Sequence, residues 1–158
     1  MYAILTAGGT PKPGEPLYEY TQGTEKAMLD IQGRPMAQWV IDALDGAQTV
    51  DHLLVIGLPA TCGLTSKKPM EFMDNQGGML ANIIAGIQRI TEKDPASQHV
   101  VIASSDVPAV QPHMIDWVVQ TALQTDDDIY YNVIERSVME KRYPGSRRSY
   151  THLKDMEI

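Results

Sequence analysis

Short apolar segments alternate with amphipathic ones along this chain, and that alternation constrains the fold more than any other feature. We expect strands at Tyr2–Thr6, His52–Ile56, Val100–Ala103 and Ile129–Val133, and helices after Pro35, after Gly77-Gly78 and from Pro112. Strands that alternate with helices build a mainly parallel sheet with helices on both faces. We therefore predict a three-layer α/β/α sandwich with a mainly parallel sheet. Tyr2–Thr6 and Val100–Ala103 should be neighbouring or near-neighbouring central strands.

Each expected helix carries apolar residues at helical spacing, which predict the face that it buries. The clearest period follows Gly77-Gly78, and it leaves Asn82 on the polar side of that helix. Met70, Met73 and Met79 are interpreted as core fillers. The predicted core faces are Met36, Trp39, Val40, Ala43 and Leu44 in the first helix, Leu80, Ile83, Ile84, Ile87 and Ile90 in the second, and Ile115, Val118, Val119, Ala122 and Leu123 in the third.

Two of the expected strands end in residues that suit ligand binding. Ligands of open parallel sheets bind beyond the carboxyl ends of the strands. Gly8-Gly9 follows the first strand and Asp106 follows the third. Glycine can turn backbone N–H groups toward an anion, and a carboxylate at a strand end is a natural Mg²⁺ ligand. A plain turn at Gly8-Gly9 and a turn-forming Asp106 remain the alternatives.

Lys26 and Asn82 are further candidates. Lys26 stands at the end of the segment Thr10–Lys26, which has three prolines and no helical period. A lysine there can reach phosphates held by the glycine turn, and the Asn82 amide can meet a base or ribose edge. Taken alone, each side chain is more simply explained as a solvated surface group. The dinucleotide motif Gly-x-Gly-x-x-Gly and the lysine-serine ending of a P-loop are both missing.

Charge and composition exclude several classes of partner. The formal net charge is −7, whereas nucleic-acid binders carry a basic patch, so we expect no nucleic-acid partner. An acidic protein that binds a polyphosphate needs local cations or a metal ion. We also expect no membrane association, because the apolar runs are short and the N-terminus has no signal-peptide pattern. Cys62 is the only cysteine, and a cytoplasmic location is the expectation.

Three segments together resemble a known family. Leu5-Thr-Ala-Gly-Gly9 followed by Glu25-Lys-Ala-Met-Leu-Asp-Ile-Gln-Gly-Arg-Pro-Met36 is similar to the N-terminal signature of the MobA-like nucleotidyltransferases, which belong to the GT-A-type group. Gly77–Asn82 resembles the segment of that family that contacts the nucleoside, and Ser105–Pro108 resembles its metal-binding strand end. Arg142–Tyr150 is similar to a stretch found in a subgroup. The resemblance implies a nucleotide-diphospho-sugar transferase-like fold.

The resemblance also implies a reaction. An acceptor phosphate or hydroxyl attacks the α-phosphorus of a nucleoside triphosphate and pyrophosphate leaves, with Mg²⁺ as cofactor and a small molecule as acceptor. Lys26 and Asp106 would be catalytic, and Asp106 would hold the metal. The nucleotide-binding residues would be Leu5, Ala7, Gly8, Gly9, Lys12, Lys26, Gly78 and Asn82. Loops that close over phosphates come from the least stable parts of a protein, so Thr10–Glu25 should be mobile without nucleotide.

The chain departs from the family pattern in two places. The family usually has an arginine in the glycine loop, where this chain has Lys12, and lysine lacks the planar fork of arginine. A second acidic metal-binding segment is also missing. We therefore expect one nucleotide-binding domain over residues 1–158, truncated on the C-terminal side relative to the family.

Three alternative functions remain open. The first is a nucleotide-binding module without turnover. The second is a glycosyltransferase on the same general fold, which would need an Asp-x-Asp motif after a strand, whereas Asp126–Asp128 precedes an expected one. The third is a structural or partner-binding domain with a decayed site.

Overall fold

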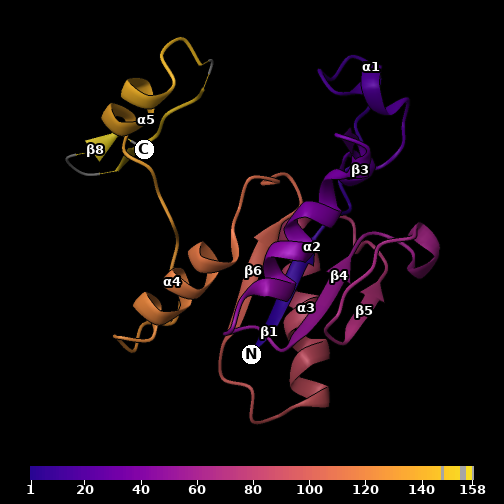
Figure 1. The fold of residues 1–158 in the computed structure, drawn as a ribbon, viewed down its shortest axis with the longest axis vertical. Coiled ribbons are helices and arrows are strands. Elements are labelled where there is room, and N and C mark those ends of the chain that lie inside the picture. Colours follow the sequence, from indigo (N-terminus) through magenta and orange to yellow (C-terminus); the bar gives the residue numbers. More distant parts are fainter. Residues whose placement is uncertain (147, 154–155, 158) are drawn as a thin grey trace. The chain divides into compact units, whose positions relative to one another are not determined.

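The computed structural model of the chain describes residues 1–146, 148–153 and 156–157. The chain divides into two compact units, Met1–Leu123 and Gln124–Ile158, which are described separately. The first unit contains the sheet and every candidate site residue (Figure 1).

A four-stranded parallel sheet forms the centre of the first unit. Its strands are β1 (Tyr2–Thr6), β4 (His52–Ile56), β5 (Met70–Met73) and β6 (Val100–Ser104), in the order β5-β4-β1-β6. The predicted strands at β1, β4 and β6 are confirmed, with β6 one residue longer than expected. The sequence did not indicate β5, because methionine and glutamate favour helix and no alternation marks the segment.

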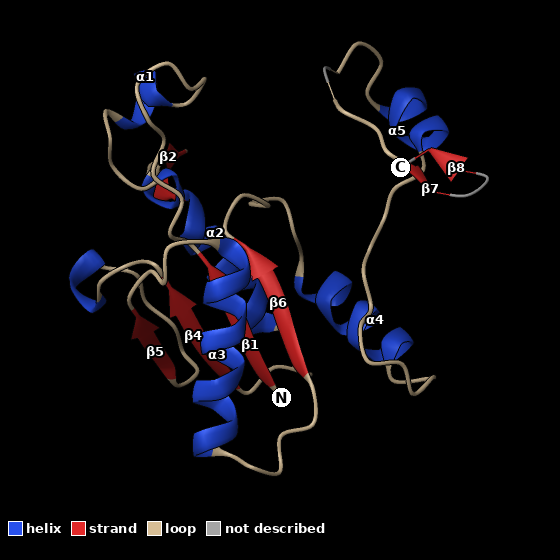
Figure 2. Ribbon diagram, turned by 180° about the vertical axis from the view of Figure 1, so that it is seen from behind, coloured by secondary structure: helices blue, strands red, loops and turns tan. Residues whose placement is uncertain are grey.

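Helices cover both faces of this sheet. α2 (Met36–Gly46) and α4 (Pro112–Ala122) pack on one face, where Leu5, Ile41 and Leu44 are fully buried. α3 (Met79–Lys93) covers the other face, against Ile4 and Ile56. α2 is in front of the sheet in Figure 1, and α3 is in front of it in the reverse view of Figure 2. The predicted three-layer α/β/α sandwich with a parallel sheet is confirmed.

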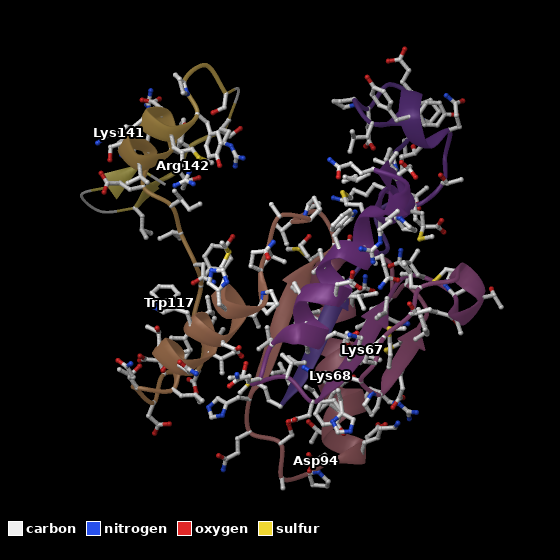
Figure 3. All side chains as sticks on the ribbon, viewed as in Figure 1. Lys67, Lys68, Asp94, Trp117, Lys141 and Arg142 are labelled. Atoms are coloured by element: carbon white, nitrogen blue, oxygen red, sulfur yellow. The ribbon has the colours of Figure 1, made fainter. Side chains whose placement is uncertain are left out.

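The C-terminal end of α2 is held by a lysine from the segment before β5. Lys68 Nζ donates to the backbone oxygens of Leu44 and Ala47 at 2.9 and 2.5 Å. The last carbonyls of a helix have no partners within the helix, and a cation there also suits the helix dipole. Lys68 therefore has a structural role at the amino-terminal edge of the sheet (Figure 3).

Trp117 lies on α4, and its side chain is 64% exposed.

The buried face of α3 differs from the predicted one. Asn82, Gly86 and Ile90 face the sheet, whereas Leu80, Ile84 and Ile87 are 69%, 47% and 40% exposed. Gly86 explains the shift, because a Cβ there would lie 2.8 Å from Ile56 Cδ1 and 3.0 Å from Ile4 Cδ1. The missing side chain lets the helix backbone approach the sheet closely along this line. The placement of Asn82 on the polar side of the helix was therefore wrong.

Three other expectations need correction. β6 neighbours β1 as predicted, but it is an edge strand rather than a central one, and Ile102 is 46% exposed. Met79 is not a core filler, since it is 72% exposed, and Leu123 at the end of α4 is 52% exposed. The segment Ile129–Val133 forms no strand. Its residues have high β-propensity, but the described part of the chain gives them no ladder partner, and propensity without pairing does not make a strand.

The segment between β1 and α2 is partly ordered into short elements. It contains α1 (Tyr18–Thr21), the 3₁₀ helix η1 (Lys26–Met28), and a small hairpin of β2 (Asp30–Ile31) and β3 (Arg34–Pro35). A second 3₁₀ helix, η2 (Ala60–Cys62), follows β4. The mobility of Thr10–Glu25 without nucleotide stays a prediction.

The second unit consists of α5 (Arg136–Arg142) and a two-stranded antiparallel hairpin of β7 (His152–Leu153) and β8 (Met156–Glu157). The guanidinium of Arg136 lies over the ring of Tyr150, 4.9 Å from its centroid. That residues 1–158 form a single nucleotide-binding domain stays a prediction. Among the described helices, none is both long enough and apolar enough to span a bilayer.

Two isoleucines of α3 test the corrected face of this helix. Ile90 is 3% exposed and Ile84 is 47% exposed, although the apolar period predicted both to be buried. We expect Ile90→Ala to lower the free energy of unfolding by about 2–5 kcal/mol, because it leaves a cavity in the core. Ile84→Ala should cost about 1 kcal/mol or less. Denaturant titration of the two variants measures both values, and equal losses would contradict the observed face.

Candidate functional site

Loops from all four strands meet at the carboxyl edge of the sheet. Because the strands are parallel and paired in register, their C-terminal ends lie side by side. Gly8-Gly9 follows β1, Gly57 follows β4, Asn75 follows β5, and Asp106 follows β6. Residues far apart in the sequence are thereby brought to one place, and Gly8-Gly9 and Asp106 lie at the edge that was predicted for them.

The glycine turn after β1 is in backbone contact with the end of β4. Gly57 has φ +102°, and a Cβ on it would lie 2.2 Å from Gly8 Cα. A Cβ on Gly8 would lie 2.8 Å from Asn75 Nδ2. Position 57 therefore needs glycine for steric reasons, whereas a side chain at position 8 would displace the Asn75 amide. Neither the Gly8 nor the Gly9 N–H donates a hydrogen bond to another group in the described part of the chain.

Lys26 lies directly over this turn. Its backbone N–H donates to Gly9 O at 2.8 Å, and its Cε is 3.0 Å from the place that a Gly9 Cβ would take. At the other end of the side chain, Nζ lies 2.8 Å from Asp106 Oδ2. Glycine at position 9 thus lets the lysine side chain cross the turn and reach the end of β6.

Asp106 is a half-exposed carboxylate with two donors. Lys26 Nζ donates to Oδ2, and Ser104 Oγ donates to Oδ1 at 2.5 Å. The hydrogen bond from Lys26, and next the one from Ser104, hold the pKa of Asp106 below its ordinary value despite partial desolvation. The carboxylate is therefore ionised at neutral pH, as a metal ligand must be.

Asn75 is a residue that the sequence did not indicate. Its Nδ2 donates to Gly8 O at 3.0 Å, and its Oδ1 accepts from Gly77 N and from Asn82 Nδ2. Asn82, 4% exposed, accepts from Gln76 N through Oδ1 at 2.7 Å. Only its position two residues after a strand end would have pointed to Asn75, and β5 itself was not predicted.

The remaining candidates are arranged differently. Leu5 and Ala7 are buried in the core at 0% and 2% exposure, so their side chains do not face a ligand. Gly78 precedes α3 with open space around it. Lys12 is exposed, and its backbone N–H donates to Glu15 rather than to the glycine turn. The structure therefore brings together Gly8, Gly9, Lys26 and Asp106, with Asn82 behind them, whereas Lys12 makes none of these contacts.

Alanine at Gly57 tests the backbone contact with Gly8. We expect Gly57→Ala to destabilise the fold by more than about 2 kcal/mol, because a left-handed backbone cost and a clash with main-chain atoms add together. Gly63→Ala is the matched control, since Gly63 has φ +81° with nothing within 4 Å. It should cost only about 1–2 kcal/mol. Thermal unfolding measures both, and a Gly57→Ala loss no larger than the control would contradict the contact.

The pKa of Asp106 tests its pairing with Lys26. A carboxylate whose folded pKa lies below its unfolded value stabilises the fold above the unfolded pKa, and this contribution is lost as pH falls through the folded pKa. In Lys26→Ala the pKa of Asp106 should rise. The hydrogen bond from Lys26, which lowers this pKa most, is then lost, and only the one from Ser104 remains. Carboxyl NMR titration without divalent metal measures this change.

Asp116 provides an internal control for that titration. Its pKa is lowered by the backbone N–H groups of Gln48 and Thr49 and by the Thr49 hydroxyl, so it should stay unchanged in the same variant. An Asp106 pKa that does not move in Lys26→Ala would contradict the pairing.

Solved structures resemble this fold. A hypothetical transferase from Thermus thermophilus matches 99% of this chain and 60% of its own, with a TM-score of 0.74 and 23% identity. CMP:2-keto-3-deoxy-manno-octonic acid synthetase, solved with CTP, matches 78% of this chain and 46% of its own, with a TM-score of 0.55 and 16% identity. A Mycobacterium tuberculosis H37Rv protein solved with manganese matches 78% of this chain and 59% of its own, with a TM-score of 0.54 and 15% identity.

These structures share the fold of this chain. The chain spans about 60% of the length of the Thermus protein. None of the curated proteins matches the chain. The sequence profile of the MobA-like NTP transferase domain matches residues 3–149. The chain thus belongs to the MobA-like NTP transferase family.

Proposed function

We propose that this chain binds a nucleoside triphosphate at the carboxyl edge of its sheet and transfers the nucleoside monophosphate to a phosphate or hydroxyl acceptor. The observation that carries the proposal is the meeting of Lys26 with Asp106 over the Gly8-Gly9 turn, across 80 positions of sequence. A cation, a carboxylate and unpaired N–H groups in one place suit a polyphosphate and its metal.

The charges of the site explain why both groups are needed. The protein carries a formal net charge of −7, so a triphosphate is repelled unless local positive charge offsets it. Lys26 and the N–H groups of Gly8 and Gly9 supply part of that charge. Without nucleotide, Lys26 and Asp106 neutralise each other. With a metal-bound triphosphate present, Lys26 would bind a phosphate oxygen and Asp106 would bind the cation.

The donor set around Asp106 suits Mg²⁺. This ion is held in proteins by one or two carboxylates together with substrate phosphates and water. Among the described residues, no group of three or more His, Cys, Asp or Glu side chains is placed to hold a metal, so Asp106 would share the ion with the nucleotide. When bound, Mg²⁺ would neutralise charge on the phosphate oxygens. Two structural neighbours, one solved with CTP and the other with manganese, support a nucleotide and a divalent metal at this site.

The reaction forms a bond between an acceptor oxygen and the α-phosphorus. The bond from that phosphorus to the oxygen bridging to the β-phosphate breaks, and pyrophosphate leaves with the electron pair. An acceptor hydroxyl also loses its proton to water, whereas an acceptor phosphate is already ionised. The protein contributes positioning and charge stabilisation rather than a covalent intermediate. The glycine turn would hold the triphosphate, and Lys26 would stabilise the charge that develops on it.

Two single substitutions test this assignment. Asp106→Ala should abolish the Mg²⁺-dependent part of triphosphate binding while leaving the fold nearly intact, because the side chain is half-exposed at a loop. Lys26→Ala should weaken triphosphate binding and retain its Mg²⁺ dependence. Titration of ATP, CTP, GTP and UTP with and without Mg²⁺ measures both effects. In melting experiments, a ligand at 100 times its Kd adds about 2.7 kcal/mol of stability.

Asp51→Ala is a suitable control for Asp106→Ala. Asp51 also forms an ion pair, with the N-terminal amine at 2.5 Å, before β4 and thus away from the site. If Asp106 only forms a turn, its loss should cost about 0.5–2 kcal/mol of stability and leave nucleotide affinity alone. Unchanged affinity in both site variants would remove the proposal. Release of pyrophosphate from the triphosphate, measured with a panel of phosphate- and hydroxyl-bearing acceptors, then separates turnover from a binding module, because a module without turnover releases none.

A further inference from the structure

Asn75 connects the glycine turn to the start of α3, and no role in the reaction described above accounts for it. We propose that Asn75, itself held by Asn82, is a positioning residue that aims the Gly9 N–H into the phosphate site. The inference rests on the proposed function and adds to it the residues that orient the phosphate-binding backbone.

Asn82 provides the fixed end of this connection. It lies on the buried face of α3 at 4% exposure, one helical turn before Gly86, where the helix backbone comes close to Ile4 and Ile56. Its Oδ1 accepts from Gln76 N at 2.7 Å, and its Nδ2 donates to Asn75 Oδ1 at 3.2 Å. A buried amide with both ends bonded holds one orientation, since rotating it would leave polar atoms unsatisfied.

The orientation of the Asn75 amide follows from its neighbours. Its Oδ1 faces two donors, Gly77 N at 3.0 Å and Asn82 Nδ2. The oxygen must therefore be on that side, because the NH₂ group cannot accept from either. The NH₂ group is then directed at Gly8 O, 3.0 Å away. The contact with Gly8 is thus a donated hydrogen bond whose direction α3 and its preceding loop decide.

A bond to Gly8 O fixes the Gly9 N–H as well. The two groups belong to one planar trans peptide, so they point in opposite directions. The next peptide is held in the same way, because Gly9 O accepts from Lys26 N at 2.8 Å. Glycine has wide backbone freedom, so an unsupported Gly8-Gly9 turn would sample many orientations. Asn75 and the Lys26 backbone remove that freedom before a phosphate arrives, which lowers the entropic cost of binding.

The test compares Asn75→Asp with Gln76→Glu. Aspartate keeps the acceptor for Gly77 and Asn82 but places an oxygen where Nδ2 donated to Gly8 O. Gln76→Glu adds the same charge one residue away, on an exposed side chain that bonds Asp74 O rather than the turn. The probes are inorganic tripolyphosphate and the triphosphate that wild type binds best, both with Mg²⁺, and calorimetry gives each Kd.

For Asn75→Asp we expect the affinity for both probes to fall by a similar factor, about threefold to tenfold beyond the control, as the loss of one hydrogen bond gives. The melting temperature without ligand should stay close to that of Gln76→Glu. Asn82→Asp, which removes the donor to Asn75 without touching the turn, should change both affinities in the same direction. When pyrophosphate release is measured with an acceptor that supports it, the KM for triphosphate should rise more than kcat falls.

Three outcomes would overturn the inference. Equal affinities in Asn75→Asp and Gln76→Glu would show that the turn does not need the bond. A loss confined to the nucleoside triphosphate, with tripolyphosphate unchanged, would mean that Asn75 contacts the nucleoside directly. A lower melting temperature with unchanged affinities would make the role structural only. Wild-type protein that binds neither probe would instead overturn the proposed function, and this inference with it.

Discussion

The parallel pairing of β1 with both β4 and β6 is the constraint on which the rest of the structure depends. Tyr2 pairs with His52 on one side and with Val100 on the other, and the register continues to Thr6 without a bulge. The C-terminal ends of three strands therefore lie at one edge. That edge places Lys26, which is anchored on the turn after β1, within hydrogen-bond distance of Asp106 after β6. A slip of one residue would turn every side chain of the strand to the other face.

The loops at this edge touch through their backbones, which is possible only where no Cβ atom stands between them. Gly57 and Gly8 touch through main-chain atoms, and Gly9 leaves room for the Lys26 side chain. A glycine has the same effect on the sheet face that α3 covers. Gly86 lets α3 lie close to β1 and β4, and Asn82 on the same side of the helix is buried. Four glycines, at positions 8, 9, 57 and 86, thus allow the approach of the groups that the proposed function uses, and Asn75 bonds both Asn82 and the turn.

Much of the fold followed from local pattern, and the failures have a common cause. Continuous apolar runs predicted β1 and β4, because strands buried on both faces lack alternation. An apolar run also predicted β6, although this strand lies at the edge of the sheet. The period of α3 was real, but the helix turned to bury Gly86 rather than Ile84, since close approach to the sheet outweighs the hydrophobicity of single positions. Ile129–Val133 has strand propensity without a partner, and β5 has a partner without strand propensity. Pairing is a long-range property that a local window does not contain.

The sequence by itself determined the fold class and the edge of the sheet where the candidate site residues gather. Both depend on the order of elements and on glycine, lysine and aspartate near strand ends. Only the tertiary structure decided that Lys26 and Asp106 form a pair, that Asn82 is buried, and that Asn75 reaches Gly8. Each of those facts joins residues from different elements. The distances between them depend on register, helix rotation and backbone contact, which are fixed only when the layers pack together.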